Sequence, residues 1–419
     1  MRRAERLGAD NRHAESVDCM QALRVLHVSP VAGDAWGYGG LSRVADALAR
    51  GLAARGHHVT LCTTDACDAT HRLRARPRYG RRHDAPPPPM TGDIDVRVFP
   101  NVSNWLAYRQ GFVPLGLRRY LERHAATFDV AHLHACRNLP GAIAARCLDT
   151  RHIPYVLAPN GTAPNLERRR LAKGVFDGLL GTRVIARASR VMAVTEAERR
   201  QLIALGVAAE RIAVVPNPVA IDEFEPPLAR GRWRQRLNIQ GPLVAYLGTL
   251  MPRKRVEILI RACAGLPAET TFVVAGNDLG SEAAIRGVAR EVGVHDRTRF
   301  TGLITGRARL ELLADADVVV YPSRHEVFGL VPLEALLAGT PVVVANDSGC
   351  GEIVAAMGGG LVVPGDPDVL RSAVAHILEA PAHWRAAAAH AARRVRATYA
   401  TDVVCAQLER LYCDILSAR

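Results

Sequence analysis

The sequence predicts an α/β protein of two doubly wound domains in tandem, which face each other across a central cleft. Short runs rich in β-branched residues alternate with segments of helical apolar spacing, which is typical of a parallel sheet covered by helices on both faces. The alternation stops at a proline-rich, charged stretch near residues 218–227 and then starts again. The length of 419 residues also suits two domains of about 100–200 residues each.

The first half of the chain supplies the strands of the first sheet. A buried strand is expected at 23–29, followed by a helix at 41–56 that ends at a glycine, and by a second strand at 58–64. The remaining strands of this half are expected at 94–99, 129–135, 154–159, 190–195 and 212–217.

The second half of the chain repeats the pattern. Two helical patterns, at about 381–398 and 401–418, close the chain. The strands of this half are expected at 243–249, 271–276, 299–303, 317–323, 341–347 and 360–366.

These elements divide the chain into a leader and two domains. Residues 1–20 are polar, show no regular apolar pattern and are expected to be disordered. Residues 21–218 form the predicted N-terminal domain, and residues 219–399 form the C-terminal one. The last helix, at about 400–419, is expected to complete the first domain. Ligands should bind in the cleft, at the carboxyl ends of the strands.

The composition is globular, with 49% hydrophobic and 23% charged residues, but the net charge is +13 and the pI about 9.8. The basic excess is almost wholly arginine, because Lys173 and Lys254 are the only lysines. It has two interpretations: a general bias toward arginine, or a basic face for an anionic partner such as a membrane surface, a phosphorylated substrate or nucleic acid. A lysine kept in such a chain indicates local chemistry that a guanidinium does not serve.

The sequence favours a cytoplasmic protein. No apolar run approaches the roughly 18–20 residues that span a bilayer, and the N-terminus has no hydrophobic segment of a secretory signal. Nine cysteines without a CxxC pair or a metal spacing favour a reduced compartment. The basic, proline-rich stretch 71–93 is expected to be a mobile loop, and 102–124 either packs as a helix or rests on lipid. A peripheral position at the inner membrane face fits these features.

Two glutamates flank an apolar turn in "SRHEVFGLVPLEALLAG". Pro322 ends a strand, residues 323–329 form the turn, and residues 330–338 form a helix. Glu326 therefore lies in the loop at the carboxyl end of the strand, and Glu334 lies on the helix.

The start of this helix is a predicted anion site. The N–H groups of Gly329, Leu330 and Val331 point out of the helix and suit a diphosphate. The carboxylates of Glu326 and Glu334 cannot bind phosphate but accept hydrogen bonds from hydroxyls, so a nucleotide sugar matches the layout. The alternative is a strand–helix junction with two solvated glutamates, and the spacing alone does not exclude it.

The surrounding sequence "PSRHEVFGLVPLEALLAGTPVVVANDSGCGEIV", at 322–354, resembles the donor-site signature of family-4 retaining glycosyltransferases (glycosyl transferases group 1), which have the GT-B fold. "YGGLSRVADALARGLAARGHHVTLCTT", at 38–64, is similar to the first glycine loop and helix of that family. "DVAHLHA", "PYVLAPNGTAP", "RVMAVTEAERRQLIALGVAAERIAVVPNPV", "YLGTLMPRKRVEILIRA" and "FVVAGND" follow in the family's order. The leader and an insertion at 65–93 lie outside the resemblance.

This resemblance implies a donor site in the C-terminal domain. Glu334 would bind the ribose hydroxyls, Glu326 the hydroxyls of the donor sugar, and Lys254 would stabilise the leaving diphosphate. Thr249 stands where the family has an arginine, and Arg253 or, as a weaker candidate, Arg255 would replace it. The base would be read near residues 303–305. The implied donor-binding residues are Gly39, Gly40, Gly248, Thr249, Arg253, Lys254, Leu303, Ile304, Phe328, Gly329, Leu330, Val331 and Glu334.

The resemblance places the acceptor side in the N-terminal domain. His134 matches a histidine near the transferred sugar, although a buried histidine at a strand end is the alternative. Asn160 stands where many relatives have the histidine of a His-Gly pair. The implied acceptor-side residues are His134, Asn138, Asn160 and Gly161, and the implied catalytic residues are Glu326, Lys254 and His134.

The family retains the anomeric configuration, and no carboxylate of this sequence is placed as an obvious covalent nucleophile. The resemblance therefore implies that the leaving phosphate takes the proton of the acceptor hydroxyl, with no metal and no cofactor besides the nucleotide-sugar co-substrate. "DAD", at 315–317, matches the Asp-x-Asp pattern of metal-dependent transferases but precedes a strand, which favours surface carboxylates. The rivals are a nucleotide-sugar epimerase of the same fold and a nucleic-acid-binding protein, for which no RNA-binding or helix-turn-helix motif is present.

Overall fold

The computed structural model describes residues 21–68, 71–73, 94–163, 181–347 and 349–418. The predicted disordered leader at 1–20 and most of the predicted loop at 71–93 lie outside these residues.

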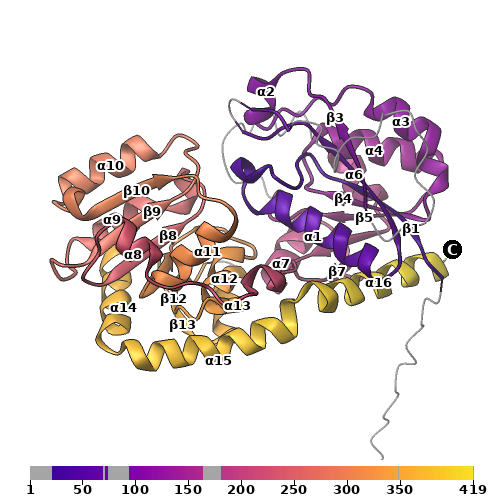
Figure 1. The fold of residues 1–419 in the computed structure, drawn as a ribbon. Coiled ribbons are helices and arrows are strands. Elements are labelled where there is room, and N and C mark those ends of the chain that lie inside the picture. Colours follow the sequence, from indigo (N-terminus) through magenta and orange to yellow (C-terminus); the bar gives the residue numbers. More distant parts are fainter. Residues whose placement is uncertain (1–20, 69–70, 74–93, 164–180, 348, 419) are drawn as a thin grey trace, which may run out of the picture.

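The first lobe is built on a fully parallel sheet with the strand order β3-β2-β1-β4-β5-β6-β7 (Figure 1). The order reverses between β1 and β4, so the loops that follow these two strands diverge and leave room for a ligand. The strands are β1 (Arg24–Val28), β2 (His58–Thr64), β3 (Asp95–Phe99), β4 (Val130–His134), β5 (Tyr155–Ala158), β6 (Arg190–Ala193) and β7 (Ile212–Val214).

The second lobe repeats this design with the parallel order β10-β9-β8-β11-β12-β13. Its order reverses between β8 and β11. The strands are β8 (Leu243–Leu247), β9 (Thr271–Ala275), β10 (Thr298–Gly302), β11 (Val318–Tyr321), β12 (Val342–Ala345) and β13 (Gly360–Val363). Every strand expected from the sequence is present, and the predicted pair of doubly wound sheets is confirmed.

Helices cover both faces of each sheet (Figure 1). Those of the first lobe are α1 (Gly40–Ala54), α2 (Asn104–Tyr108), α3 (Leu117–His124), α4 (Leu139–Thr150), α6 (Thr182–Arg187) and α7 (Glu196–Ala204), with the short turn η1 (Trp36–Tyr38). Those of the second are α8 (Arg232–Arg236), α9 (Val256–Cys263), α10 (Glu282–Glu291), α11 (Gly306–Asp315), α12 (Leu330–Leu337), α13 (Gly349–Met357) and α14 (Pro367–Glu379), with the turn η6 (Pro252–Lys254). The turn η5 (Ile221–Phe224) lies in the connection between the lobes.

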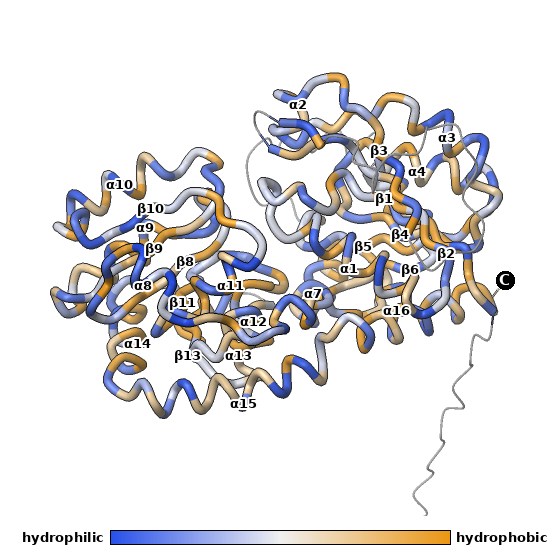
Figure 2. Tube along the Cα trace, in the orientation of Figure 1, coloured by the Kyte–Doolittle hydropathy of each residue, from blue (hydrophilic) through white to orange (hydrophobic). Residues whose placement is uncertain are grey.

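The core follows the alternation of side chains along the strands. On β1, Val25 faces the cluster that contains α1, whereas Leu26 and Val28 face the cluster that contains α3 and α4. Figure 2 shows the central strands of both lobes as mainly hydrophobic segments, because strands covered on both faces need apolar side chains on both.

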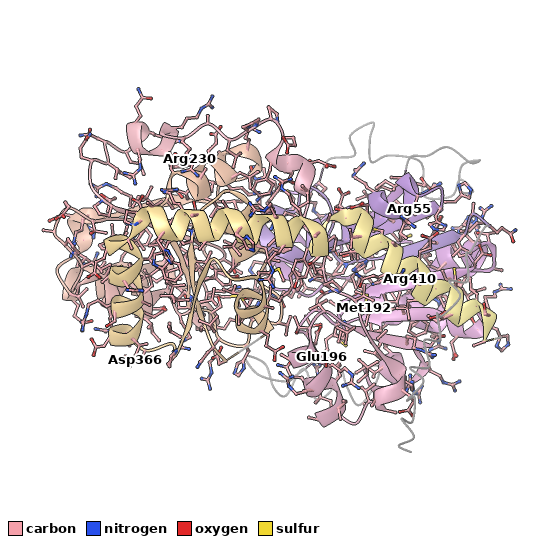
Figure 3. The ribbon with its side chains drawn as sticks, turned by 90° about the horizontal axis from the view of Figure 1, so that it is seen from below. Arg55, Met192, Glu196, Arg230, Asp366 and Arg410 are labelled. Carbon is pink, nitrogen blue, oxygen red and sulfur yellow. The ribbon has the colours of Figure 1, made fainter. Side chains whose placement is uncertain are left out.

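Two long helices join the lobes along one side of the molecule (Figure 3). α15 (Pro381–Tyr399) packs against α12, and α16 (Thr401–Ser417) packs against α1 of the first lobe. Val219 N donates to Tyr399 O at 2.8 Å, so the chain's outward and return crossings between the lobes lie side by side. Between α16 and the first lobe, His57 Nε2 lies 3.1 Å from Glu409 Oε1.

The ambiguous segment 102–124 forms α2 and α3. Leu117, Tyr120 and Leu121 of α3 are buried, whereas the Trp105 side chain of α2 is 63% exposed with the Arg109 guanidinium over its ring. Within the described ranges no helix is long and apolar enough to cross a membrane. Cys413 is disulfide-bonded, so the expectation of a reduced chain is wrong at this position.

Candidate active site

The candidate site lies where the switch points of the two sheets face each other. In the second lobe the loop after β8 carries residues 248–254 and the loop after β11 carries residues 322–329. In the first lobe the loop after β1 carries Gly39, α1 begins at Gly40, and the loop after β5 carries Asn160 and Gly161. These are the ends at which ligands bind in open parallel sheets.

Lys254 and Glu326 form an ion pair at the centre of the second-lobe loops. Lys254 Nζ donates to Glu326 Oε2 and, at 2.6 Å, to the hydroxyl of Tyr321 at the end of β11. The Tyr321 hydroxyl also lies 3.3 Å from Glu326 Oε2. The structure therefore brings together two of the three residues predicted to be catalytic.

Burial and the neighbouring charges shift the pKa values of Lys254 and Glu326 in opposite directions. Burial lowers the pKa of Lys254, and the carboxylate of Glu326 counteracts that effect only in part. Burial raises the pKa of Glu326, but Lys254 and Arg253 lower it more, so its pKa lies below the ordinary value. Glu326 is therefore held as a carboxylate, the form that accepts hydrogen bonds from sugar hydroxyls.

The turn at Gly329 has a conformation that requires glycine. Its φ is 80°, and a Cβ at this position would lie 2.5 Å from Sγ of Cys350. α12 begins at the next residue. The first N–H groups of a helix have no partner within the helix and suit an anion. The ring of Phe328 is buried against Tyr399, so this residue contributes its backbone rather than its side chain to the cleft.

Loops of the first lobe reach across the cleft to the same turn. A Cβ on Gly40 would lie 3.0 Å from Leu330 Cδ1, and one on Gly39 would lie 3.8 Å from Thr249 Cγ2. A Cβ on Gly161 would lie 3.0 Å from Cγ2 of Val327. The predicted residues of both domains thus meet around the Gly329 turn.

Glu334 lies on α12 and is almost fully buried. Arg43 from α1 lies 2.5 Å from its Oε1, and Arg309 from α11 lies 2.9 Å from the same oxygen. Burial raises the pKa of Glu334, but the two guanidinium groups lower it more, so this carboxyl is also ionised.

Arg253 and Arg255 are the two candidates to replace the arginine that the family has at the position of Thr249. Arg255 has other partners. Arg255 donates to the carbonyl of Gly365 and lies 3.7 Å from Asp347. Arg253 is partly exposed, and its charge acts on Glu326 of the Lys254–Glu326 pair. Arg253 is therefore the better placed of the two to contact a diphosphate.

The predicted base-binding residues lie at the carboxyl end of β10, which is the edge strand of the second sheet. Leu303 is 43% exposed and Ile304 is partly buried. α11 begins a few residues later and carries Arg309, which pairs with Glu334. One helix therefore connects the edge of the sheet to this ion pair.

His134 is fully buried in the core rather than exposed in the cleft. Its Nε2 lies 3.1 Å from Nδ1 of His27, and its ring stacks on His132 at 4.5 Å between centroids. His132 Nδ1 lies 2.8 Å from the hydroxyl of Tyr412 on α16. The structure therefore does not bring His134 into contact with Lys254 or Glu326.

The burial of His27, His132 and His134 predicts that the protein loses stability in mild acid. Burial lowers the pKa of His134 to about 3 and, with the neighbouring imidazoles, holds the pKa values of His27 and His132 well below normal. The unfolded chain takes up protons below about pH 6.5 that the folded chain does not. The free energy of unfolding should therefore fall as the pH drops from 6.5 to 5 in denaturant titrations.

The substitution His132→Gln isolates this effect. Glutamine can still hydrogen-bond Tyr412 but does not titrate, so the slope should decrease by up to one proton, or about 1.4 kcal/mol per pH unit. Exposed His295→Gln is the control and should leave the slope unchanged. An unchanged slope in His132→Gln would contradict the assignment of a buried neutral imidazole.

Asn138 and Asn160 have different surroundings. The Asn138 side chain caps α4, accepting from Gly141 N at 2.7 Å and donating to the carbonyls of His134 and Ala135, so its polar atoms are used by the backbone. Asn160 Oδ1 is buried and accepts no hydrogen bond within the described part of the chain. Of these two asparagines, Asn160 is therefore the one whose side-chain oxygen lacks a donor among the described residues.

Glu198 on α7 supports the acceptor-side loop. Its carboxylate accepts from Gly161 N at 2.6 Å and from Val194 N at 2.8 Å. Burial raises its pKa to about 7, against the effect of these two N–H groups. Sequence reasoning missed this residue, although Thr195 and Glu198 have the spacing of a helix capping box, which was a usable signal.

The "DAD" carboxylates have structural partners. Asp315 accepts from the backbone N–H groups at the start of α8, including Trp233 N at 2.7 Å. Asp317 accepts from Leu243 N at 2.8 Å and from Arg385 at 3.0 Å. These bonds hold α8 and the start of β8 onto the second lobe. Asp315 is only 3% exposed, so the expectation of a surface carboxylate is wrong at this position.

Two facing parallel-sheet domains, with a glycine turn at the start of α12 and two ionised glutamates beside it, have the architecture of GT-B glycosyltransferases. A family model of glycosyl transferases group 1 matches residues 229–395, and one of Glycosyltransferase Family 4 matches residues 38–223. The chain is 30% identical over 420 residues to D-inositol 3-phosphate glycosyltransferase of Xylanimonas cellulosilytica, covering 95% of this chain and 97% of the relative. It therefore belongs to the family-4 retaining glycosyltransferases and takes a sugar from a nucleotide-sugar donor.

A further relative agrees with this assignment, and two solved structures share the fold. The D-inositol 3-phosphate glycosyltransferase of Acidothermus cellulolyticus is 30% identical, covering 89% of this chain and 86% of the relative. The crystal structure of Anabaena HepE in complex with UDP and glucose has a TM-score of 0.72 at 20% identity, covering 94% of this chain and 100% of HepE. WaaG, a glycosyltransferase involved in lipopolysaccharide biosynthesis, has a TM-score of 0.64 at 20% identity, covering 93% and 99%. The fold predicted from the sequence is confirmed.

Proposed function

We propose that this enzyme moves a hexosyl group from a nucleoside diphosphate sugar to a hydroxyl of a glycan or lipid-linked acceptor. The observation that carries the proposal is the grouping of Lys254, Glu326 and Glu334 around the Gly329 turn, opposite the Gly39–Gly40 loop. The diphosphate would bind the N–H groups at residues 329–331, with Glu334 on the ribose and Glu326 on the sugar.

In the proposed step, the acceptor oxygen bonds to the anomeric carbon on the face that the diphosphate leaves. The bond from the anomeric carbon to the phosphate oxygen breaks, and the proton of the acceptor hydroxyl moves to that phosphate. The ammonium group of Lys254 stabilises the negative charge that develops on the diphosphate, helped by Arg253. The protein's remaining task is to orient the two substrates.

The names of the relatives point to a second class of acceptor. Several of them are named for transfer to an inositol phosphate, a small phosphorylated polyol. An acceptor panel with an inositol phosphate, a polyprenyl-linked sugar and a soluble oligosaccharide separates the two classes. The donor is identified by a thermal-shift screen of UDP-, GDP- and ADP-sugars, since a ligand at 100 times its dissociation constant stabilises a protein by about 2.7 kcal/mol.

Transfer is expected to survive an excess of chelator. The Asp-x-Asp carboxylates at 315 and 317 bind backbone N–H groups and arginines, so they are committed to the fold. The test is the initial rate with and without EDTA after dialysis. Complete loss of activity that manganese or magnesium restores would contradict the proposed metal-independent step.

We also propose a cytoplasmic enzyme that acts at the inner membrane face. Arginines at 74, 76, 78, 81 and 82 carry the suggested attraction to anionic lipid and lie outside the described residues. Arg72, the first of the series, pairs with Asp65 at 3.0 Å and donates to Asn101 O at 2.9 Å. Arg72 is thus part of the folded domain, and salt-sensitive sedimentation with anionic vesicles tests the other five.

A further inference from the structure

Glu334 lies at the centre of a chain of charges that connects the two lobes. Its Oε1 is bound by Arg43 of the first lobe at 2.5 Å and by Arg309 of the second at 2.9 Å. Arg309 also pairs with Glu223 in η5, the connection between the lobes. The side chains of Arg43, Arg309 and Glu334 are 18%, 3% and 5% exposed, so these charges are paired largely away from water.

The indole ring of Trp36 fixes both arginines. The guanidinium carbon of Arg43 and that of Arg309 each lie 5.3 Å from its centroid, which is within the range of a cation–π contact. Trp36 lies in η1, just before the Gly39–Gly40 loop. The first lobe therefore supplies both the ring that holds the two arginines and one of the arginines.

The second oxygen of Glu334 differs from the first in its surroundings. Within the part of the chain that the structure describes, Oε2 is buried and accepts no hydrogen bond. A buried carboxylate oxygen without a donor is unfavourable and is normally satisfied by a ligand or water. Arg43 donates a hydrogen bond to Oε1 and Arg309 Nη1 lies 2.9 Å from the same oxygen, so both positive charges lie beside Oε1 and Oε2 is left as the acceptor for a hydroxyl.

The positions of the residues along the two helices link this arrangement to closure of the cleft. Arg43 lies one turn after Gly40 on α1, and Glu334 lies one turn after Leu330 on α12. Gly40 and Leu330 are already in close approach. Movement of the lobes apart would separate Arg43 from Glu334, whereas Arg309 belongs to the same lobe as Glu334 and would stay in place.

On the basis of the donor site proposed above, we propose that Arg43 and Arg309 are positioning residues that fix Glu334 for the ribose hydroxyls of the donor nucleotide. Arg309 does so in every arrangement of the lobes. Arg43 does so only when the cleft is closed, so that ribose recognition and domain closure favour each other.

The test is the preference of the enzyme for ribose over dideoxyribose. The affinity of wild-type protein for UDP, GDP and ADP is measured by calorimetry, and the tightest ligand is compared with its 2′,3′-dideoxy analogue. Hydrogen bonds to an ionised carboxylate predict a preference of about tenfold to a hundredfold. Arg43→Ala should reduce this ratio to within about threefold, Arg43→Lys should restore part of it, and Glu334→Gln should abolish most of it. A loss of fold alone would weaken both ligands equally and leave the ratio unchanged.

Arg50→Ala is the matched control, because Arg50 lies on the same helix and pairs with Asp46 at its exposed face. It should keep the wild-type ratio. If Arg43→Ala also keeps the ratio while Glu334→Gln loses it, the positioning role of Arg43 is wrong and the donor site stands. If wild-type protein binds a nucleotide without any ribose preference, the proposed role of Glu334 is wrong, and the role of Arg43 falls with it.

Discussion

The substitution Glu326→Ala is expected to lower the rate of sugar transfer about 10³-fold, while the affinity for the nucleoside diphosphate changes little. Glu326 is assigned to the donor sugar, so its loss removes the acceptor of the sugar hydroxyls but none of the proposed phosphate contacts. Its loss also frees the ammonium group of Lys254, which is otherwise paired with it. The measurements are the turnover number and the dissociation constant of the diphosphate for the same variant.

Two further variants make this prediction specific. Glu326→Gln keeps the size of the side chain and removes its charge, so it should be nearly as inactive as Glu326→Ala if the ionised carboxylate is required. Glu291→Ala removes a surface glutamate that pairs with Arg261, and it should have wild-type activity. Turnover at the wild-type rate in Glu326→Ala would remove Glu326 from the mechanism.

The substitution Lys254→Ala is expected to lower the turnover number by about 10²–10³, the usual effect of losing one positioned group that stabilises developing charge. Lys254 is 6% exposed and enclosed by Tyr321 and Glu326, so the larger, planar guanidinium of Lys254→Arg should restore little activity. The pH dependence of kcat is measured together with the rate, because without Lys254 the pKa of buried Glu326 should rise.

Variants of the neighbouring arginines decide what replaces the family's arginine at Thr249. Arg253→Ala should lower the turnover number, whereas Arg255→Ala should affect stability more than rate, because Arg255 binds the Gly365 carbonyl. If Arg253→Ala has no effect on rate, this phosphate contact is absent from the enzyme. If Lys254→Ala turns over at the wild-type rate, the leaving diphosphate is stabilised by another group.

The fold could be predicted because its determinants are local. Each strand is a short apolar run bounded by turn residues, and the fully buried parallel sheets allow such runs on both faces. The Glu326–Gly329–Glu334 turn was predictable for the same reason, since its strand, glycine and helix are contiguous in the chain.

The contacts that complete the site could not be predicted in this way. Arg43 and Glu334 are separated by 291 residues, and His27 and His134 by 107, so no local pattern relates them. Arginine also carries little information in this chain, because nearly all of its basic residues are arginine. The surroundings of His134 depend on the register of β1 with β4 and on the return of α16 to the first lobe, which bring His27, His132 and Tyr412 around it.

The most direct test is a product analysis of nucleotide sugars incubated with purified protein, without an added acceptor. A transferase with the proposed donor site should slowly release the free nucleoside diphosphate from one of the UDP-, GDP- or ADP-sugars, and Glu326→Gln should release far less. Conversion of the sugar with its diphosphate bond intact would indicate an epimerase. Consumption of no donor, together with tight binding of nucleic acid, would contradict the assignment of this cleft to sugar transfer.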